Sequence, residues 1–137
     1  MDASKLHIIA VTGFLQRDGK FLILRRSEKE IAHPGQWTVP GGKVEGKDSI
    51  LNTLKKEIKE ETGLDVYEDY EFLGDGEFTR PDSYHVVIPR FLCKAKPGEV
   101  KIDKNDFTDF AWIGLDELDK YDLIPGIKKD FEQLKNK

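Results

Sequence analysis

Three glutamates, Glu57, Glu60 and Glu61, are spaced three and four residues apart. In a helix these spacings put the carboxylates side by side, which destabilises the helix by roughly 0.2–0.5 kcal/mol per like-charged pair. One interpretation is a solvated face crossed by salt bridges. It suits Glu60, which follows Lys56 by four residues, but leaves Glu57 without a basic neighbour at helical spacing. The other is a site for Mg²⁺ or Mn²⁺, because these hard cations prefer oxygen ligands.

A helix must position these carboxylates, and its sequence pattern is present. Apolar residues recur at helical spacing, which predicts an amphipathic helix; they are Ile50, Leu51, Leu54 and Ile58. Asp48 and Ser49 are both good N-cap residue types, so the helix should begin near them. Gly63 stands where a left-handed C-terminal cap is expected.

The same stretch resembles the Nudix box, a glycine, five residues, an acid, seven residues, and then Arg-Glu-apolar-x-Glu-Glu-x-Gly-apolar. The matching residues are Gly42, Glu57, Ile58, Glu60, Glu61, Gly63 and Leu64. Two positions depart from this pattern, since Asp48 replaces the family's glutamate and Lys56 its arginine. A lysine offers a point charge, so a bidentate pair is impossible. We hypothesise that Asp48 and Lys56 still touch; the alternative is an aspartate that caps the helix beside a solvated lysine.

The resemblance implies a metal-dependent active site. The glutamates Glu57, Glu60 and Glu61, with the backbone carbonyl of Gly42, are its implied ligands for Mg²⁺ or Mn²⁺. Asp106, six residues before a strand tryptophan, resembles an acidic loop of the family and joins the three glutamates as a catalytic candidate. Its alternative role is a solvated turn aspartate. For the general base, Glu57 is the first candidate and Asp106 the second.

The resemblance also implies a small-molecule partner, a nucleotide or other nucleoside diphosphate derivative. Arg26 ends a predicted strand and is expected to face a substrate phosphate, because a guanidinium fork suits phosphate oxygens; a solvated strand end is the alternative. Lys43 is placed with it among the residues that contact substrate. Phe78 and Tyr84 lie where they can face a base, although core or surface positions remain open.

We predict a nucleoside triphosphate pyrophosphohydrolase that releases a monophosphate and pyrophosphate. Two alternatives belong to other classes. One is a catalytically weak Nudix module that binds a nucleotide or a protein. The other is a structural domain whose acidic helix is only a surface.

The remaining pattern predicts an α+β fold, and the resemblance implies a Nudix-like α/β/α sandwich with a mixed sheet and a central catalytic helix. The predicted strands are His7–Leu15, Lys20–Arg25, Tyr70–Phe78, Tyr84–Ala95, Val100–Lys104 and Phe107–Ile113, with further helices at Leu115–Leu118 and Pro125–Leu134. Asp18-Gly19 predicts a hairpin turn. Pro89 predicts an edge strand or a bulge.

Length and composition indicate an ordinary globular chain. Its 137 residues predict one domain over 1–137. A net charge of −4 gives no reason to expect nucleic-acid or membrane binding. The one cysteine, Cys93, is expected to be a buried hydrophobe. Without a signal peptide or membrane-span pattern, we expect a cytoplasmic monomer or homodimer.

Overall fold

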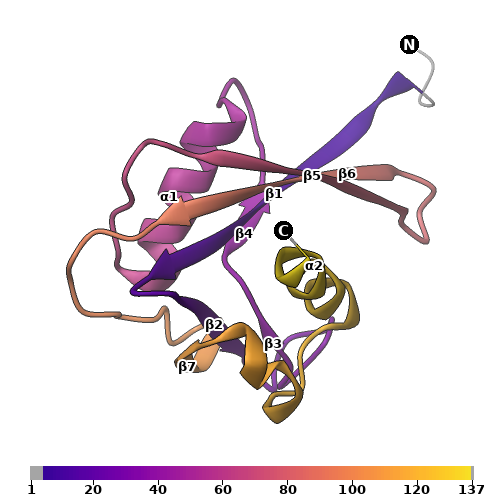
Figure 1. The fold of residues 1–137 in the computed structure, drawn as a ribbon. Coiled ribbons are helices and arrows are strands. Elements are labelled where there is room, and N and C mark those ends of the chain that lie inside the picture. Colours follow the sequence, from indigo (N-terminus) through magenta and orange to yellow (C-terminus); the bar gives the residue numbers. More distant parts are fainter. Residues whose placement is uncertain (1–4, 137) are drawn as a thin grey trace.

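A mixed β-sheet stands between two helical layers in the computed structural model, which describes residues 5–136 (Figure 1). Its strands are β1 (His7–Arg17), β2 (Lys20–Arg26), β3 (Trp37–Thr38), β4 (Gly41–Lys43), β5 (Glu71–Thr79), β6 (His85–Lys94) and β7 (Phe107–Ile113). The helices are α1 (Ile50–Thr62), a 3₁₀ helix (Leu115–Lys120) and α2 (Pro125–Lys135). The predicted α+β class and mixed sheet are therefore confirmed.

The sheet brings together parts of the chain that are far apart in sequence. The strand order is β3-β2-β1-β6-β5, with β4 paired to β1 and β7 paired to β2. Strands β1 and β6 run parallel, with His7 opposite His85, whereas the other named pairs are antiparallel. Strands β1, β5 and β6 extend together beyond the rest of the sheet (Figure 1).

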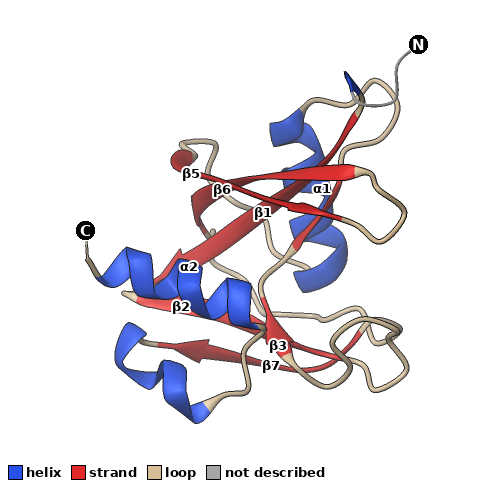
Figure 2. Cartoon of the chain, turned by 90° about the vertical axis from the view of Figure 1, so that its right-hand side faces the viewer, coloured by secondary structure: helices blue, strands red, loops and turns tan. Residues whose placement is uncertain are grey.

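Alternate residues of β2 face the two helical layers, which lie on opposite sides of the sheet (Figure 2). Leu22 and Leu24 join the apolar cluster beneath α1, whereas Phe21 and Ile23 join the cluster beneath α2. None of these four side chains is more than 4% exposed. A segment buried on both faces has to be apolar at consecutive positions, as Phe21–Leu24 is; the charged residues of β2 lie at its two ends.

A glycine allows α1 to lie close to β1. A Cβ atom at Gly13 would meet Leu54 Cδ1 at 2.9 Å and Ile58 Cδ1 at 3.4 Å. Leu54 and Ile58 are both fully buried residues of α1. The missing side chain at Gly13 therefore helps set the height of the acidic helix above the sheet.

The predicted hairpin is confirmed and its strands are longer than expected. Strand β1 reaches Arg17 and β2 reaches Arg26. Asp18 and Gly19 connect them with φ angles of 54° and 77°, the left-handed conformations that a tight hairpin turn requires. Cys93 is fully buried as expected, and burial raises the pKa of its thiol to about 12.

Two strand predictions are wrong. Val100–Lys104 forms no strand; its backbone instead ties onto the end of α1, where the Lys101 N–H donates to the Thr62 carbonyl at 2.8 Å. Of the two alternatives predicted from Pro89, the edge position is wrong, because β6 lies between β1 and β5. The pairing of β5 with β6 is irregular next to Pro89, since its register shifts between Phe72 and Gly74. Pro89 is tolerated there because the β1–β6 pairing skips Ile88 and Pro89 without a change of register.

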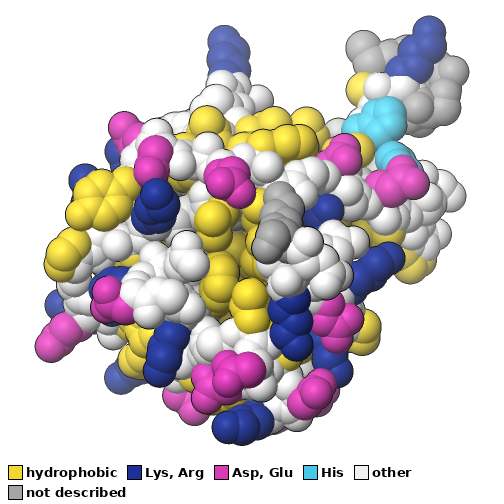
Figure 3. Space-filling model, viewed as in Figure 1, with side chains coloured by type: hydrophobic (Ala, Val, Ile, Leu, Met, Phe, Trp, Pro, Cys, Tyr) yellow, Lys and Arg dark blue, Asp and Glu magenta, His cyan; other side chains and the backbone are white. Residues whose placement is uncertain are grey.

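No helix within residues 5–136 is long and apolar enough to cross a membrane. On the face seen in Figure 3, acidic and basic side chains are interspersed around exposed hydrophobic groups. This face therefore presents no broad patch of a single charge.

Packing of α2 on the sheet predicts the effect of Phe131→Ala. The Phe131 ring is fully buried and meets the Phe14 and Phe21 rings edge-on, with centroids 5.0 and 5.6 Å away. Its removal should lower the free energy of unfolding by about 3–5 kcal/mol, measured by urea denaturation. Ile31→Ala is the control, because Ile31 is fully exposed and its loss should change stability by less than about 0.5 kcal/mol. Equal effects would contradict this packing.

Candidate active site

Helix α1 is fixed at both ends by the residue types expected from the sequence. The Ser49 side chain accepts a hydrogen bond from the Asn52 N–H, so Ser49 is the N-cap. Gly63 ends the helix with a φ of 75°, and its N–H donates to the Lys59 carbonyl. The buried stripe of α1 runs through Leu54 and Ile58. These contacts fix the rotation of the helix and hence the positions of its glutamates.

Glu61 is a buried carboxyl on the stripe that faces the sheet. Its side chain is only 9% exposed, and Oε2 accepts a hydrogen bond from the Gly41 N–H at 3.2 Å. Burial raises the pKa of Glu61 to about 8, and the nearby charges of Glu57 and Asp106 act in the same direction. The Gly41 N–H opposes this shift but does not cancel it. The protonated, neutral form of metal-free Glu61 is therefore favoured at neutral pH.

Strand β4 passes so close to α1 and β1 that only glycine fits. A Cβ atom at Gly41 would lie 2.4 Å from the Val11 carbonyl oxygen. A Cβ atom at Gly42 would lie 2.6 Å from Glu57 Cδ. The Glu57 side chain thus packs against Gly42, which brings the residue of the predicted carbonyl ligand close to a predicted carboxylate ligand.

The three predicted glutamates differ in exposure. Glu60 is exposed, Glu57 is half-buried and Glu61 is buried. Burial raises the pKa of Glu57, and the charge of Glu60 adds to that rise. Within residues 5–136, no three acidic, histidine or cysteine side chains converge closely enough to hold an ion as they stand. Mutual repulsion is a sufficient reason for carboxylates to stay apart without a cation.

Asp106 lies beside these glutamates, although it comes from a distant loop. The Asp103 N–H donates to the Glu61 carbonyl at 3.2 Å, and the Asp106 N–H donates to the Asp103 carbonyl at 3.1 Å. The charge of Asp106 contributes to the raised pKa values of both Glu57 and Glu61. Burial raises the pKa of Asp106 itself, with further increases from the charges of Asp103 and Glu30.

Arg26 reaches the same end of the molecule but is engaged by its own loop. Its Nε donates to the Ala32 carbonyl at 2.9 Å, and its Nη2 pairs with Glu30 Oε2 at 3.2 Å. The charge of Arg26 lowers the pKa of Asp106, opposing the effect of burial. Glu30 therefore stands between the predicted phosphate-binding arginine and the predicted acidic loop, and the sequence pattern did not single it out.

Lys43 and the Asp48–Lys56 pair line a cleft of about 290 Å³ that also includes Glu57 and Glu60. Asp48 Oδ2 lies 2.6 Å from Lys56 Nζ, so the hypothesis that this pair still touches is confirmed. The hydrogen bond from Lys56 lowers the pKa of Asp48. Lys56 thus ties α1 to the loop that precedes it, through Asp48. Ser49 rather than Asp48 caps the helix.

The two predicted aromatic contacts are separated. Phe78, which is 50% exposed, lines a cavity of about 500 Å³ between α2 and strands β1, β5 and β6. Tyr84 does not line this cavity; it lies beyond β5, with the Arg80 guanidinium 5.9 Å from its ring centroid. Thr12 also lines the cavity and is the register partner of Gly41, so the cavity reaches the strand that carries the Glu61 contact.

Three polar residues of this cavity, Arg90, Asp130 and Gln133, were absent from the sequence prediction. Arg90 belongs to β6, and the other two belong to α2. Arg90 is 40 or more positions from the other two residues, so no pattern of short spacings could have predicted that they meet; only the tertiary structure brings them together.

Comparisons with known proteins agree on the family. Residues 6–134 match the NUDIX domain. A nucleoside triphosphatase, NudI, from Escherichia coli O139:H28 is 30% identical over 128 residues, covering 87% of this chain and 90% of that protein. The crystal structure of a MutT protein from Methanosarcina mazei Go1 matches with a TM-score of 0.80 and 26% identity, covering 96% of this chain and 95% of the other.

A second solved structure supports the same conclusion. The MutT NUDIX hydrolase from Burkholderia pseudomallei matches with a TM-score of 0.78 and 25% identity, covering 94% of this chain and 98% of the other. This chain therefore belongs to the NUDIX family and is a hydrolase that acts on diphosphate bonds.

Proposed function

We propose that this protein hydrolyses nucleoside triphosphates to a monophosphate and pyrophosphate, using Mg²⁺ or Mn²⁺. Nudix hydrolases generally use divalent metal ions and act on small-molecule nucleotides. The observation that carries the proposal is the buried carboxyl of Glu61 beside Glu57 and Asp106. A buried anion needs a compensating partner, and one backbone N–H is the only hydrogen-bond donor to it in the described part of the chain.

The donor atoms fit a hard divalent cation. Glu57, Glu60 and Glu61 offer carboxylate oxygens, and Gly42, whose carbonyl is the fourth proposed ligand, packs so closely on Glu57 that a Cβ atom would lie 2.6 Å from its carboxyl carbon. Oxygen ligands of this kind suit Mg²⁺ and Mn²⁺. When bound, such an ion neutralises phosphate charge and lowers the pKa of an attacking water.

Acidic side chains of the site then take part in proton transfer. Glu57 accepts the proton of the attacking water at a carboxylate oxygen, with Asp106 as the second candidate for this role. A base pKa raised toward the working pH favours such a transfer, and both residues have raised pKa values. The water oxygen bonds to phosphorus as the bond to the leaving phosphate oxygen breaks.

We assign the binding of the phosphates to two basic residues, Arg26 and Lys43. Arg26 already pairs with a carboxylate, Glu30, and its fork is equally suited to phosphate oxygens. Lys43 lines the cleft that contains Glu57 and Glu60. The cavity beside Phe78 accommodates the nucleoside. The unit is a single domain over 1–137, acting as a monomer or homodimer; residues 1–4 and 137 of that range lie outside the described residues.

Replacing the glutamates should separate catalysis from folding. Glu57→Gln, Glu60→Gln and Glu61→Gln should each lower kcat by roughly 10²-fold or more, because charge stabilisation in the transition state is lost. The metal-free variants should stay folded, since each change removes repulsion. Glu68→Gln is a matched control: Glu68 is exposed, and its only ion pair within residues 5–136 is with Lys55 at 2.8 Å. Full activity of all three variants in saturating Mg²⁺ would contradict the proposed site.

The stability of the metal-free protein should depend on pH through Glu61. The pKa of Glu61 is raised to about 8 in the folded protein, against 4.5 when unperturbed, so the folded state binds more protons between these pH values. The free energy of unfolding should therefore decrease as pH rises through this window, by at most about 1.4 kcal/mol per pH unit from this group.

Denaturation in EDTA at several pH values measures this slope. Glu61→Gln should flatten it, because the glutamine does not titrate. Added Mg²⁺ should stabilise the wild-type protein most at the alkaline end, where the carboxylate is ionised. A slope that is unchanged in Glu61→Gln would assign the pH dependence to other groups.

The products test the bond that is cleaved. A nucleoside triphosphate hydrolysed in ¹⁸O-labelled water should give monophosphate and pyrophosphate, with label in only one of them. Ion-exchange chromatography with mass spectrometry identifies both products. A diphosphate product with labelled orthophosphate would instead mean that the terminal phosphate is removed, which would refute the pyrophosphohydrolase assignment.

A further inference from the structure

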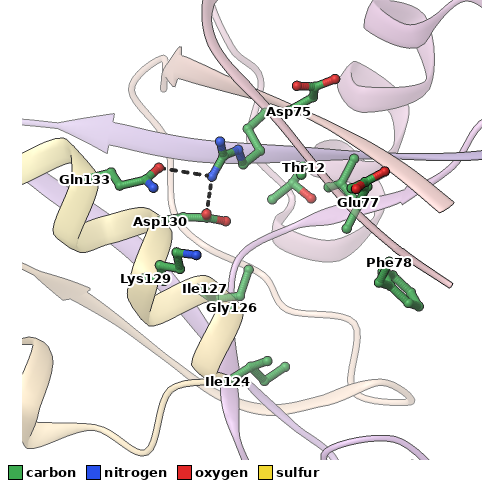
Figure 4. Close-up of a pocket in the computed structure, with 13 residues that line it drawn as sticks. Thr12, Asp75, Glu77, Phe78, Ile124, Gly126, Ile127, Lys129, Asp130 and Gln133 are labelled. Carbon is green, nitrogen blue, oxygen red and sulfur yellow. Dashed lines mark hydrogen bonds and ion pairs between the residues drawn. The ribbon is translucent and has the colours of Figure 1, made fainter.

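Apolar and charged side chains together line the 500 Å³ cavity between α2 and the extended strands (Figure 4). Phe78, Ile88, Ile124 and Ile127 form the apolar part. Charged residues form much of the rest: Asp75, Glu77 and Asp130 are acidic, whereas Arg90 and Lys129 are basic. With three acids against two bases, this cavity does not suit a polyphosphate. It suits a neutral heterocycle that carries hydrogen-bond donors.

One ion pair among the charged residues of the cavity is largely buried. Arg90 Nη1 pairs with Asp130 Oδ1, and these side chains are only 12% and 19% exposed. Arg90 Nη1 also approaches Gln133 Oε1 at 3.4 Å (Figure 4). Within residues 5–136, no donor is bonded to Asp130 Oδ2. Burial raises the pKa of Asp130, although Arg90 opposes this shift and favours the carboxylate.

The contact with Arg90 also orients the Gln133 amide. Because a guanidinium only donates hydrogen bonds, the amide oxygen of Gln133 must face it, and the amide nitrogen is left to donate elsewhere. Asp130 and Gln133 are three residues apart on α2, so their side chains lie on the same face of the helix. The face of α2 that lines the cavity therefore offers a hydrogen-bond acceptor, Asp130 Oδ2, next to a hydrogen-bond donor, Gln133 Nε2.

We propose that Asp130, held by Arg90 and assisted by Gln133, selects a nucleobase with an exocyclic amino group beside an unprotonated ring nitrogen, as in cytosine or adenine. The amino group donates to Asp130 and the ring nitrogen accepts from Gln133. In uracil or hypoxanthine the corresponding edge has a carbonyl beside an N–H. The carbonyl, an acceptor, would then face the Asp130 carboxylate, and the ring N–H, a donor, would face the Gln133 amide N–H. This inference rests on the proposed function, because it names the class of nucleotide that the hydrolase accepts.

The position of the cavity relative to the acidic helix supports this role. Thr12 lines the cavity and pairs in register with Gly41. The Gly41 N–H in turn donates to Glu61. Only the backbones of β1 and β4 therefore separate a nucleoside in the cavity from the carboxylates of α1. Its phosphates would extend away from the acidic residues of the cavity and toward the carboxylates of α1.

The test compares substrates that differ only in the edge of the base. Initial rates with Mg²⁺ give kcat/KM for dCTP against dUTP, and for dATP against dITP. The wild-type protein should favour the amino member of at least one pair by about tenfold or more, as expected when a site built for a hydrogen bond meets the wrong partner. Asp130→Asn should bring the ratio to about one or reverse it, because the amide can donate to a carbonyl.

The ratio within one preparation is independent of how much of a variant is folded. Asp119→Asn is the control: it too removes an acid that pairs with a cation, here Lys128 at 2.9 Å, but Asp119 does not line the cavity. It should keep the wild-type ratios. Wild-type ratios near one in both pairs, or ratios unchanged in Asp130→Asn, would overturn the inference.

Failure of the proposed function is a separate outcome. If the wild-type protein turns over none of the four triphosphates, the pyrophosphohydrolase assignment fails, and selection is then tested by binding alone. Cytidine and uridine, and likewise adenosine and inosine, are titrated into the wild-type protein and Asp130→Asn while amide NMR shifts of α2 are followed. Tighter binding of an amino nucleoside that is lost in Asp130→Asn supports the selection, whereas equal binding within both pairs overturns it.

Discussion

The burial of one carboxyl, that of Glu61, constrains the whole site. The group is held in the narrow space between α1 and β4, where the Gly41 N–H is its hydrogen-bond donor. A buried charge is costly without partners, so this arrangement persists only if the backbone lies close to the helix. Glycines at positions 13, 41 and 42 permit that closeness, and the caps of α1 keep the helix from rotating away.

The same carboxyl connects protonation with metal binding. Glu61 fits its surroundings either as a neutral acid or as an anion beside a cation; without a cation, burial and the neighbouring negative charges favour the neutral acid and raise its pKa. Glu57 and Asp106 have raised pKa values for related reasons, burial first and neighbouring negative charge second. These groups form one electrostatic unit, so a change at any of them alters the others.

Local patterns predicted the local parts of the structure. The spacing of apolar residues and the cap residues placed α1, and Asp18-Gly19 placed the first hairpin, because these depend on neighbours within a few residues. Strands β3 and β4 were missed, since two and three residues are too few to show a period. Val100–Lys104 resembled a strand but is held by contacts with α1. The Arg90–Asp130 pair joins two distant segments, and no short-range rule could find it.

The parallel pairing of β1 with β6 has a consequence for synthesis on the ribosome. The acidic helix and the strands it covers, β1 and β4, lie early in the chain, so they can associate while later segments are still being made. The cavity needs β5, β6 and α2, and α2 comes last. A nascent chain thus contains the helix with its three glutamates before the strands and the helix of the cavity, and the Asp106 loop follows β6. The three glutamates and α2 are coded by separate stretches, so changes in the last helix can alter the cavity without changing the acidic helix.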